Sequence, residues 1–140
     1  MSQNPLVIAV VDDEPQMRKA LRRLLVTHGY DVRDYALAAE LLATLPDSPP
    51  DCLLLDLHMP EVSGFEVLER FALQQNTPPV VVITGHDEPG TAERVILLGA
   101  TALLRKPVDA ASLLCAIETA TGVVRRPGDS SLRAIPAQTK

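Results

Sequence analysis

The stretch that decides the fold is Leu6-Val-Ile-Ala-Val-Val-Asp-Asp-Glu-Pro15, in which an unbroken apolar run leads directly into three acids and a proline. A continuous apolar run is typical of a strand that is covered on both faces, as in a parallel sheet. Proline is well tolerated in the first turn of a helix. The stretch therefore predicts a buried strand, an acidic turn and the start of a helix.

The same alternation recurs along the chain. Short apolar runs that alternate with segments of helical period indicate an α/β fold built of βα units around a parallel sheet. The first, third and fourth runs are continuously apolar, which places them at the centre of that sheet. The five predicted strands are residues 6–11, 32–35, 52–55, 80–83 and 102–104.

The first three predicted helices carry recognisable end signals. Apolar residues at helical spacing follow Pro15, and Gly29 stands where a left-handed residue ends a helix. Leucines at residues 37–45 predict a short second helix. Ser63 and Glu66 have the spacing of a capping box and predict the start of the third.

The fourth and fifth helices are predicted from single caps. Asp87 or Glu88 is expected to cap the fourth, with Pro89 early in it and Gly99 after its end. Asp109 is expected to cap the fifth.

The bulk composition predicts one compact domain. The chain has 140 residues, of which 46% are apolar, enough for a core of its own. The helical pattern stops near Gly122, and the residues that follow have linker composition. We expect a domain at residues 1–122, followed at residues 123–140 by a flexible tail or the start of a linker.

The charge argues against wide contact with nucleic acid. The net charge is −5, which disfavours phosphate backbones unless basic groups cluster on one face. The nearest cluster consists of Arg18, Lys19, Arg22 and Arg23. Their helical spacing favours a solvated face over a nucleic-acid contact.

Two cysteines and the absence of long apolar segments bear on location. Cys52 and Cys115 lie in apolar surroundings, so we expect buried thiols of a reducing compartment. No leader-like segment opens the chain and no apolar stretch approaches the length of a membrane span. We therefore expect a cytoplasmic location without membrane contact.

In open parallel sheets, ligands bind beyond the carboxyl ends of the strands. Polar residues follow the predicted strands at these ends. Asp12 and Asp13 follow the first strand, Asp56 the third, Thr84 the fourth and Lys106 the fifth. Since the carboxyl ends of parallel strands share one edge, three carboxylates, a hydroxyl and an ammonium should converge there.

Such a group of acids needs a cation, because neighbouring carboxylates resist ionisation. Mg²⁺ prefers oxygen ligands and commonly takes one or two carboxylates together with phosphoryl oxygens. Asp13 and Asp56 are suitable direct ligands, with Asp12 acting through water. A carboxylate oxygen can also attack phosphorus, and Lys106 and Thr84 can neutralise the transferred group.

These residues fall in motifs that resemble the response regulator receiver family of two-component signalling, from Leu6 to about Thr121. Any one motif is weak evidence, whereas four in order at matching strand ends are strong. They are Val11-Asp12-Asp13-Glu14-Pro15, Leu55-Asp56-Leu57-His58-Met59-Pro60 with Gly64 following, Ile83-Thr84-Gly85-His86, and Leu104-Arg105-Lys106-Pro107.

The resemblance implies a role for each residue. Asp56 would be the phosphoacceptor, Asp12 and Asp13 the acidic pocket, Thr84 the switch hydroxyl and Lys106 the phosphate-sensing cation. A histidine kinase or phosphotransfer protein would donate the phosphoryl group.

The resemblance also implies a fold and partners. The backbone carbonyl of His58 would complete the Mg²⁺ shell, and the peptide between Lys106 and Pro107 would be cis. The fold would be flavodoxin-like and doubly wound, with five flanking helices and a sheet of order 2-1-3-4-5. An output domain or a second copy would dock on the face of helix four, strand five and helix five. The chain looks similar to receivers that precede LuxR-type output domains.

Three positions depart from the family or stay open. Leu103 stands where many receivers carry an aromatic switch residue, so a leucine would report the switch by packing alone. His58 and His86 are either rim residues without a chemical task, which we favour, or residues that influence access of water to the phosphoryl group.

Two other functions share these residues. A haloacid-dehalogenase-like phosphatase also uses an aspartate nucleophile and Mg²⁺, but its general acid lies two residues later, where this chain has His58. A receiver-like module that is never phosphorylated would be expected to lack Asp56 or Lys106, and both are present. We therefore expect a phosphorylated switch and not an enzyme that turns over separate substrates.

Overall fold

The computed structural model describes residues 5–86, 88–124 and 133–134, and the order of its main sheet is the predicted one. Five strands lie in the order β2-β1-β3-β4-β5, and each neighbouring pair is parallel. The strands are β1 (Val7–Val11), β2 (Asp31–Tyr35), β3 (Cys52–Asp56), β4 (Val80–Thr84) and β5 (Ala102–Arg105).

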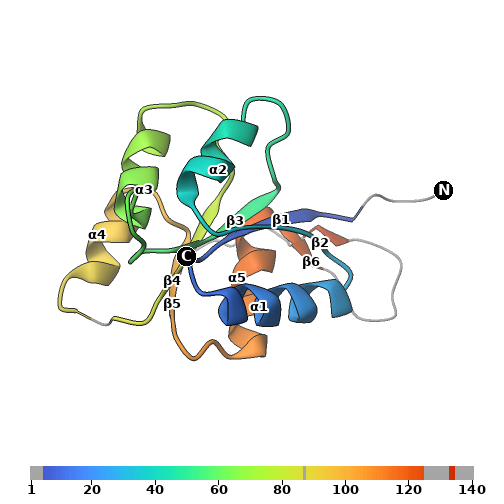
Figure 1. The fold of residues 1–140 in the computed structure, drawn as a ribbon. Coiled ribbons are helices and arrows are strands. Elements are labelled where there is room, and N and C mark those ends of the chain that lie inside the picture. The colour runs from blue at the N-terminus through green and yellow to red at the C-terminus, as the bar shows by residue number, and fades with distance from the viewer. Residues whose placement is uncertain (1–4, 87, 125–132, 135–140) are drawn as a thin grey trace.

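Five helices connect these strands and cover both faces of the sheet (Figure 1). In Figure 1, α2 and α3 lie above the sheet and α4 lies to its left, while α1 and α5 lie below it. Val95 of α4 belongs to the same core cluster as the buried residues of α2 and α3. The helices are α1 (Pro15–Thr27), α2 (Ala38–Thr44), α3 (Gly64–Ala72), α4 (Thr91–Leu97) and α5 (Ala110–Thr121).

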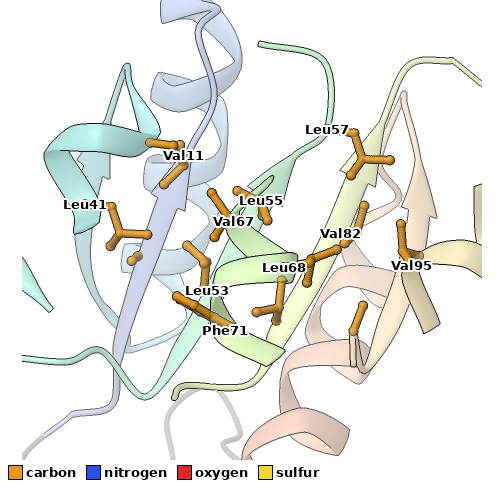
Figure 2. Packing of buried hydrophobic residues seen from close by; sticks show 14 of the residues in the cluster. Val11, Leu41, Leu53, Leu55, Leu57, Val67, Leu68, Phe71, Val82 and Val95 are labelled. Carbon is orange, nitrogen blue, oxygen red and sulfur yellow. The ribbon is translucent and has the colours of Figure 1, made fainter. Parts of the chain in front are cut away.

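The central strands supply both halves of the core because successive side chains point to opposite faces. In β1, Ala9 and Val11 pack toward α2 and α3, whereas Ile8 and Val10 pack toward α1 and α5. Figure 2 shows the first of these clusters, in which Leu53 and Leu55 of β3 meet Val67, Leu68 and Phe71 of α3. The continuously apolar runs are therefore explained by burial on both sides.

Most of the predicted helix ends are confirmed. Pro15 occupies the first turn of α1, and Gly29 follows it with φ 91°. The Ser63 hydroxyl accepts a hydrogen bond from the backbone N–H of Glu66, and the Glu66 carboxylate accepts one from the backbone N–H of Ser63. The Asp109 carboxylate accepts from the N–H of Ser112 at 3.0 Å and caps α5.

The predicted start of α4 is wrong. The helix begins at Thr91, its N-cap is Gly90 with φ 84°, and Glu88 and Pro89 lie ahead of it. Asp87, the other predicted cap, lies outside the described residues. The sequence pattern missed the cap because Gly90 makes no side-chain hydrogen bond and acts through its left-handed backbone.

The cysteine prediction is half right. Cys52 is fully buried in β3, but Cys115 is exposed on α5. Position 115 falls on the solvent side of that helix, whose buried residues are Leu113, Ala116 and Ile117.

The segment after α5 holds a short ladder that the sequence did not predict. Gly122 ends α5 with φ 75°, and Val123–Val124 (β6) then pairs antiparallel with Arg133–Ala134 (β7). The other residues of the predicted tail lie outside the described ones, and the division at residue 122 stays a prediction. Within the described residues, no helix has the length and apolar character needed to span a membrane.

Candidate functional site

Three carboxylates meet where β1 and β3 end. Val11 of β1 pairs in register with Leu55 of β3, so Asp12 and Asp56 follow side by side. One oxygen from each of Asp12, Asp13 and Asp56 lies within 4.8 Å of the others. Asp12 and Asp56 are buried, whereas Asp13 is exposed at the rim. The predicted convergence of the acids is therefore found.

The position of Asp56 makes its charge costly. Burial raises the pKa of Asp56 from 3.8 to about 6, and the charges of Asp12 and Asp13 act in the same direction. The Lys106 ammonium and the backbone N–H of His58 lower the pKa but do not offset the burial. Such a perturbed acid in a cleft is a candidate for chemistry or for cation binding.

Lys106 supplies the positive charge nearest to the acids. Its Nζ lies 3.0 Å from an oxygen of Asp12, 3.1 Å from one of Glu14 and 3.7 Å from one of Asp56. Burial lowers the pKa of Lys106, but the bonds to Asp12 and Glu14 and the charge of Asp56 outweigh it, so the pKa is raised. The sequence did not reveal the contact with Glu14, since an acid after a strand is common in turns.

Thr84 is buried at the end of β4, but its hydroxyl is directed to the adjoining loop. Its Oγ1 donates to the carbonyl of His86 at 3.1 Å and accepts from the backbone N–H of His86 at 3.1 Å. The Lys106 N–H in turn donates to the carbonyl of Thr84 at 2.9 Å. The structure thus places Thr84 beside Lys106, with the hydroxyl engaged by the His86 backbone.

The backbone of His58 borders the acids, and its side chain faces His86. The His58 N–H donates to Oδ1 of Asp56 at 3.3 Å. The two exposed imidazole rings lie edge to face with centroids 4.6 Å apart. They line a cavity of about 310 Å³ whose walls are Asp13, Glu14, Asp56, His58, Gly85, His86 and Lys106.

The loop after β3 is held by a glycine that cannot be replaced without movement. A Cβ on Gly64 would lie 2.5 Å from the carbonyl oxygen of Asp56 and 2.8 Å from Cα of Leu57. The Gly64 N–H donates to the carbonyl of Leu57 at 3.0 Å. This close approach fixes the loop that carries His58.

Oxygen donors dominate this pocket, so its residues fit a hard divalent ion. Three carboxylates from two adjacent strand ends, two of them buried, provide the donor set that Mg²⁺ takes. The predicted cis peptide between Lys106 and Pro107 is present. Of the basic residues of α1, Arg18 and Arg22 pair with Asp34 of β2, and the Arg18 guanidinium also donates to the backbone carbonyl of Asp12 at 2.7 Å.

Comparisons with known proteins agree with this geometry. The profile of the response regulator receiver domain matches residues 8–118. The transcriptional regulatory protein FixJ of Bradyrhizobium diazoefficiens is 35% identical over 113 residues, which are 81% of this chain and 55% of FixJ. The chain thus spans about half the length of that relative.

Solved structures show the same likeness. A receiver protein from Burkholderia phymatum is 36% identical, with a TM-score of 0.76 over 88% of this chain and 98% of that one. The FixJ-N crystal structure is 33% identical, with a TM-score of 0.78 over 85% of this chain and 95% of that one. The fold, the clustered strand ends and these matches have one explanation: the chain belongs to the response regulator receiver domain family.

Proposed function

We propose that Asp56 of this receiver domain accepts a phosphoryl group from the phosphohistidine of a histidine kinase or a phosphotransfer protein. The observation that carries this proposal is the buried Asp56 carboxylate, which lies 3.7 Å from the Lys106 ammonium on a cavity that opens to solvent. A carboxylate oxygen of Asp56 would form a bond to phosphorus as the bond from phosphorus to the donor imidazole breaks. The electron pair leaves with the imidazole, which takes up a proton.

Mg²⁺ is the cofactor that the acids fit best. Asp13 and Asp56 would hold it directly, Asp12 through water, and the backbone carbonyl of His58 would complete its shell. Bound there, it neutralises charge that develops on the phosphoryl oxygens.

Two further residues respond to the transferred group. Lys106 would exchange part of its contact with Asp12 and Glu14 for a phosphoryl oxygen, since its Nζ is already within reach of Asp56. Thr84 would redirect its hydroxyl from the carbonyl of His86 to another phosphoryl oxygen. Loss of that bond frees the loop before α4 and shifts a two-state equilibrium.

The output would be read on α4, β5 and α5. Ile96 and Leu97 of α4 are apolar yet 48% and 87% exposed, which suits a partner surface for an output domain or a second copy. We further propose that the chain acts in the cytoplasm, does not bind nucleic acid directly, and does not turn over separate substrates.

The test is the intact mass of the protein after incubation with a small phosphodonor and Mg²⁺. We expect one added phosphoryl group on the wild type and none on D56N, and no addition when the cation is chelated. An unchanged mass, or equal labelling without any divalent cation, would refute the proposal.

Two further assays separate the two alternatives. Steady release of phosphate from small esters, abolished in D56N, would instead indicate a haloacid-dehalogenase-like phosphatase. A protein whose Thr84 amide does not respond to beryllofluoride and Mg²⁺ would instead be a binding module that is not phosphorylated.

A further inference from the structure

A set of ring contacts leads from the cavity to α4. The ring centroids of His86 and His58 lie 4.6 Å apart, and those of His58 and Phe65 lie 6.4 Å apart, both in T-shaped arrangements. The guanidinium carbon of Arg94 lies 3.9 Å from the centroid of the Phe65 ring. We call His86, His58, Phe65 and Arg94 the ring stack. It connects the loop after β4, the loop after β3, α3 and α4.

One end of the ring stack is tied to the switch hydroxyl. Thr84 holds both the N–H and the carbonyl of His86 through its Oγ1. Because these bonds hold the backbone of His86, they fix the point from which its side chain leaves the chain. Any movement of the Thr84 hydroxyl away from the His86 carbonyl therefore disturbs the first contact of the stack.

The other end lies on α4, a short helix with few buried side chains. Of the seven residues of α4, only Thr91 and Val95 are buried. Gly90 and Gly99 flank it with φ 84° and 107°, and an added Cβ at either would meet nothing within 4 Å. A short helix with a single buried apolar side chain depends on its remaining contacts for its position.

We propose that the ring stack holds α4 in its resting position and that phosphorylation releases α4 by breaking the stack at His86. This inference rests on the proposed function, since it assigns the route by which Asp56 and Thr84 act on α4. Leu103 of β5 stands at the position where many receivers carry a switching aromatic ring. In this chain Phe65 of α3 instead makes an aromatic contact with Arg94 of α4.

Linkage fixes the sign of the effect. Contacts made only in the resting state oppose the activated state, and their removal favours any ligand that binds the activated state. A cation–π contact at an exposed site is worth enough to change such an affinity by about two- to fivefold. The Arg94–Glu69 pair, at 3.9 Å and more than half exposed, should add little.

The test is a titration of the whole chain with beryllofluoride and Mg²⁺ at constant pH. Binding is measured at each step from the amide signal of Thr84. R94Q should bind beryllofluoride about two- to fivefold more tightly than the wild type. F65L should do the same, and the double variant F65L/R94Q should bind no more tightly than F65L, since both remove one contact. Two controls separate other causes: R70Q removes a charge from exposed Arg70 on α3, and E69Q removes the ion pair alone.

The outcomes are distinct. Wild-type affinity or weaker binding in R94Q overturns the inference, as does an equal gain in E69Q or R70Q. A fold defect in F65L leaves R94Q to decide, because Arg94 is on the surface. A wild-type protein that fails to bind beryllofluoride refutes the proposed function itself, a result that no variant of the ring stack can produce.

Discussion

At the scale of single residues, Asp56 combines burial with charge, and its pKa of about 6 makes stability depend on pH. The folded state holds the proton of Asp56 more tightly than the unfolded state, whose pKa is near 3.8. The proton bound to Asp56 therefore contributes fully to the stability of the folded state below about pH 4, and this contribution is lost as the pH rises through about 6.

We predict that D56N is more stable than the wild type at pH 7 in the presence of a chelator. The gain should be on the order of 2–3 kcal/mol, the equivalent of the pKa shift. It should shrink below pH 6 and vanish only well below pH 4, where Asp56 is protonated in both the folded and the unfolded state. Urea unfolding of both proteins across this range measures the difference. Parallel stability curves would show that the Asp56 charge carries no such cost.

The two thiols should differ in reactivity, because the thiolate is the reactive form. Cys52 is fully buried, and that burial raises its pKa to about 12. We predict that an alkylating reagent modifies Cys115 in the native protein and modifies Cys52 only after unfolding. Peptide mass spectrometry after timed labelling measures both. In C115S the native protein should stay unlabelled, and early labelling of Cys52 there would mean that β3 opens readily.

At the scale of elements, the loop between β3 and α3 depends on the close approach of Gly64 to the backbone. We predict that G64A is less stable by about 1–3 kcal/mol, since a methyl group there forces backbone atoms apart. G85A is the matched control: its Cβ meets only Cδ of Lys106, at an ordinary 3.6 Å. Chemical denaturation compares them, and equal stabilities would show that the loop yields without cost.

How well each element was predicted depends on where its signal lies. The central strands were found because two buried faces leave unbroken apolar runs, and α3 and α5 because their caps are side chains. The start of α4 was missed because its cap is the backbone conformation of Gly90. Likewise, the strand ends predicted that Asp12, Asp56 and Lys106 meet, whereas the bonds between Thr84 and His86 depend on loop geometry that no spacing encodes.

At the scale of the whole molecule, the topology concentrates charge that the fold alone does not neutralise. A chain of net charge −5 gathers three carboxylates within 4.8 Å at one edge of its sheet, and Lys106 is the cation in contact with two of them among the described residues. Asp12 and Asp56 are nearly inaccessible to water. The folded state therefore brings together acids that the unfolded chain keeps apart, and a divalent cation bound to all three would bind the folded state alone.

We predict that Mg²⁺ raises the thermal midpoint of unfolding, because a ligand that binds only the folded state stabilises it. At a concentration of one hundred times its Kd the gain would be about 2.7 kcal/mol. D13N should lose most of this gain, since Asp13 is an exposed acid of the cluster and its replacement disturbs little else. D31N makes the same change of charge at the opposite end of the sheet, where β2 begins, and should keep the full gain. Scanning calorimetry at matched ionic strength separates site binding from screening, and a similar loss in D31N would mean that Mg²⁺ acts through the net charge and not through the acidic cluster.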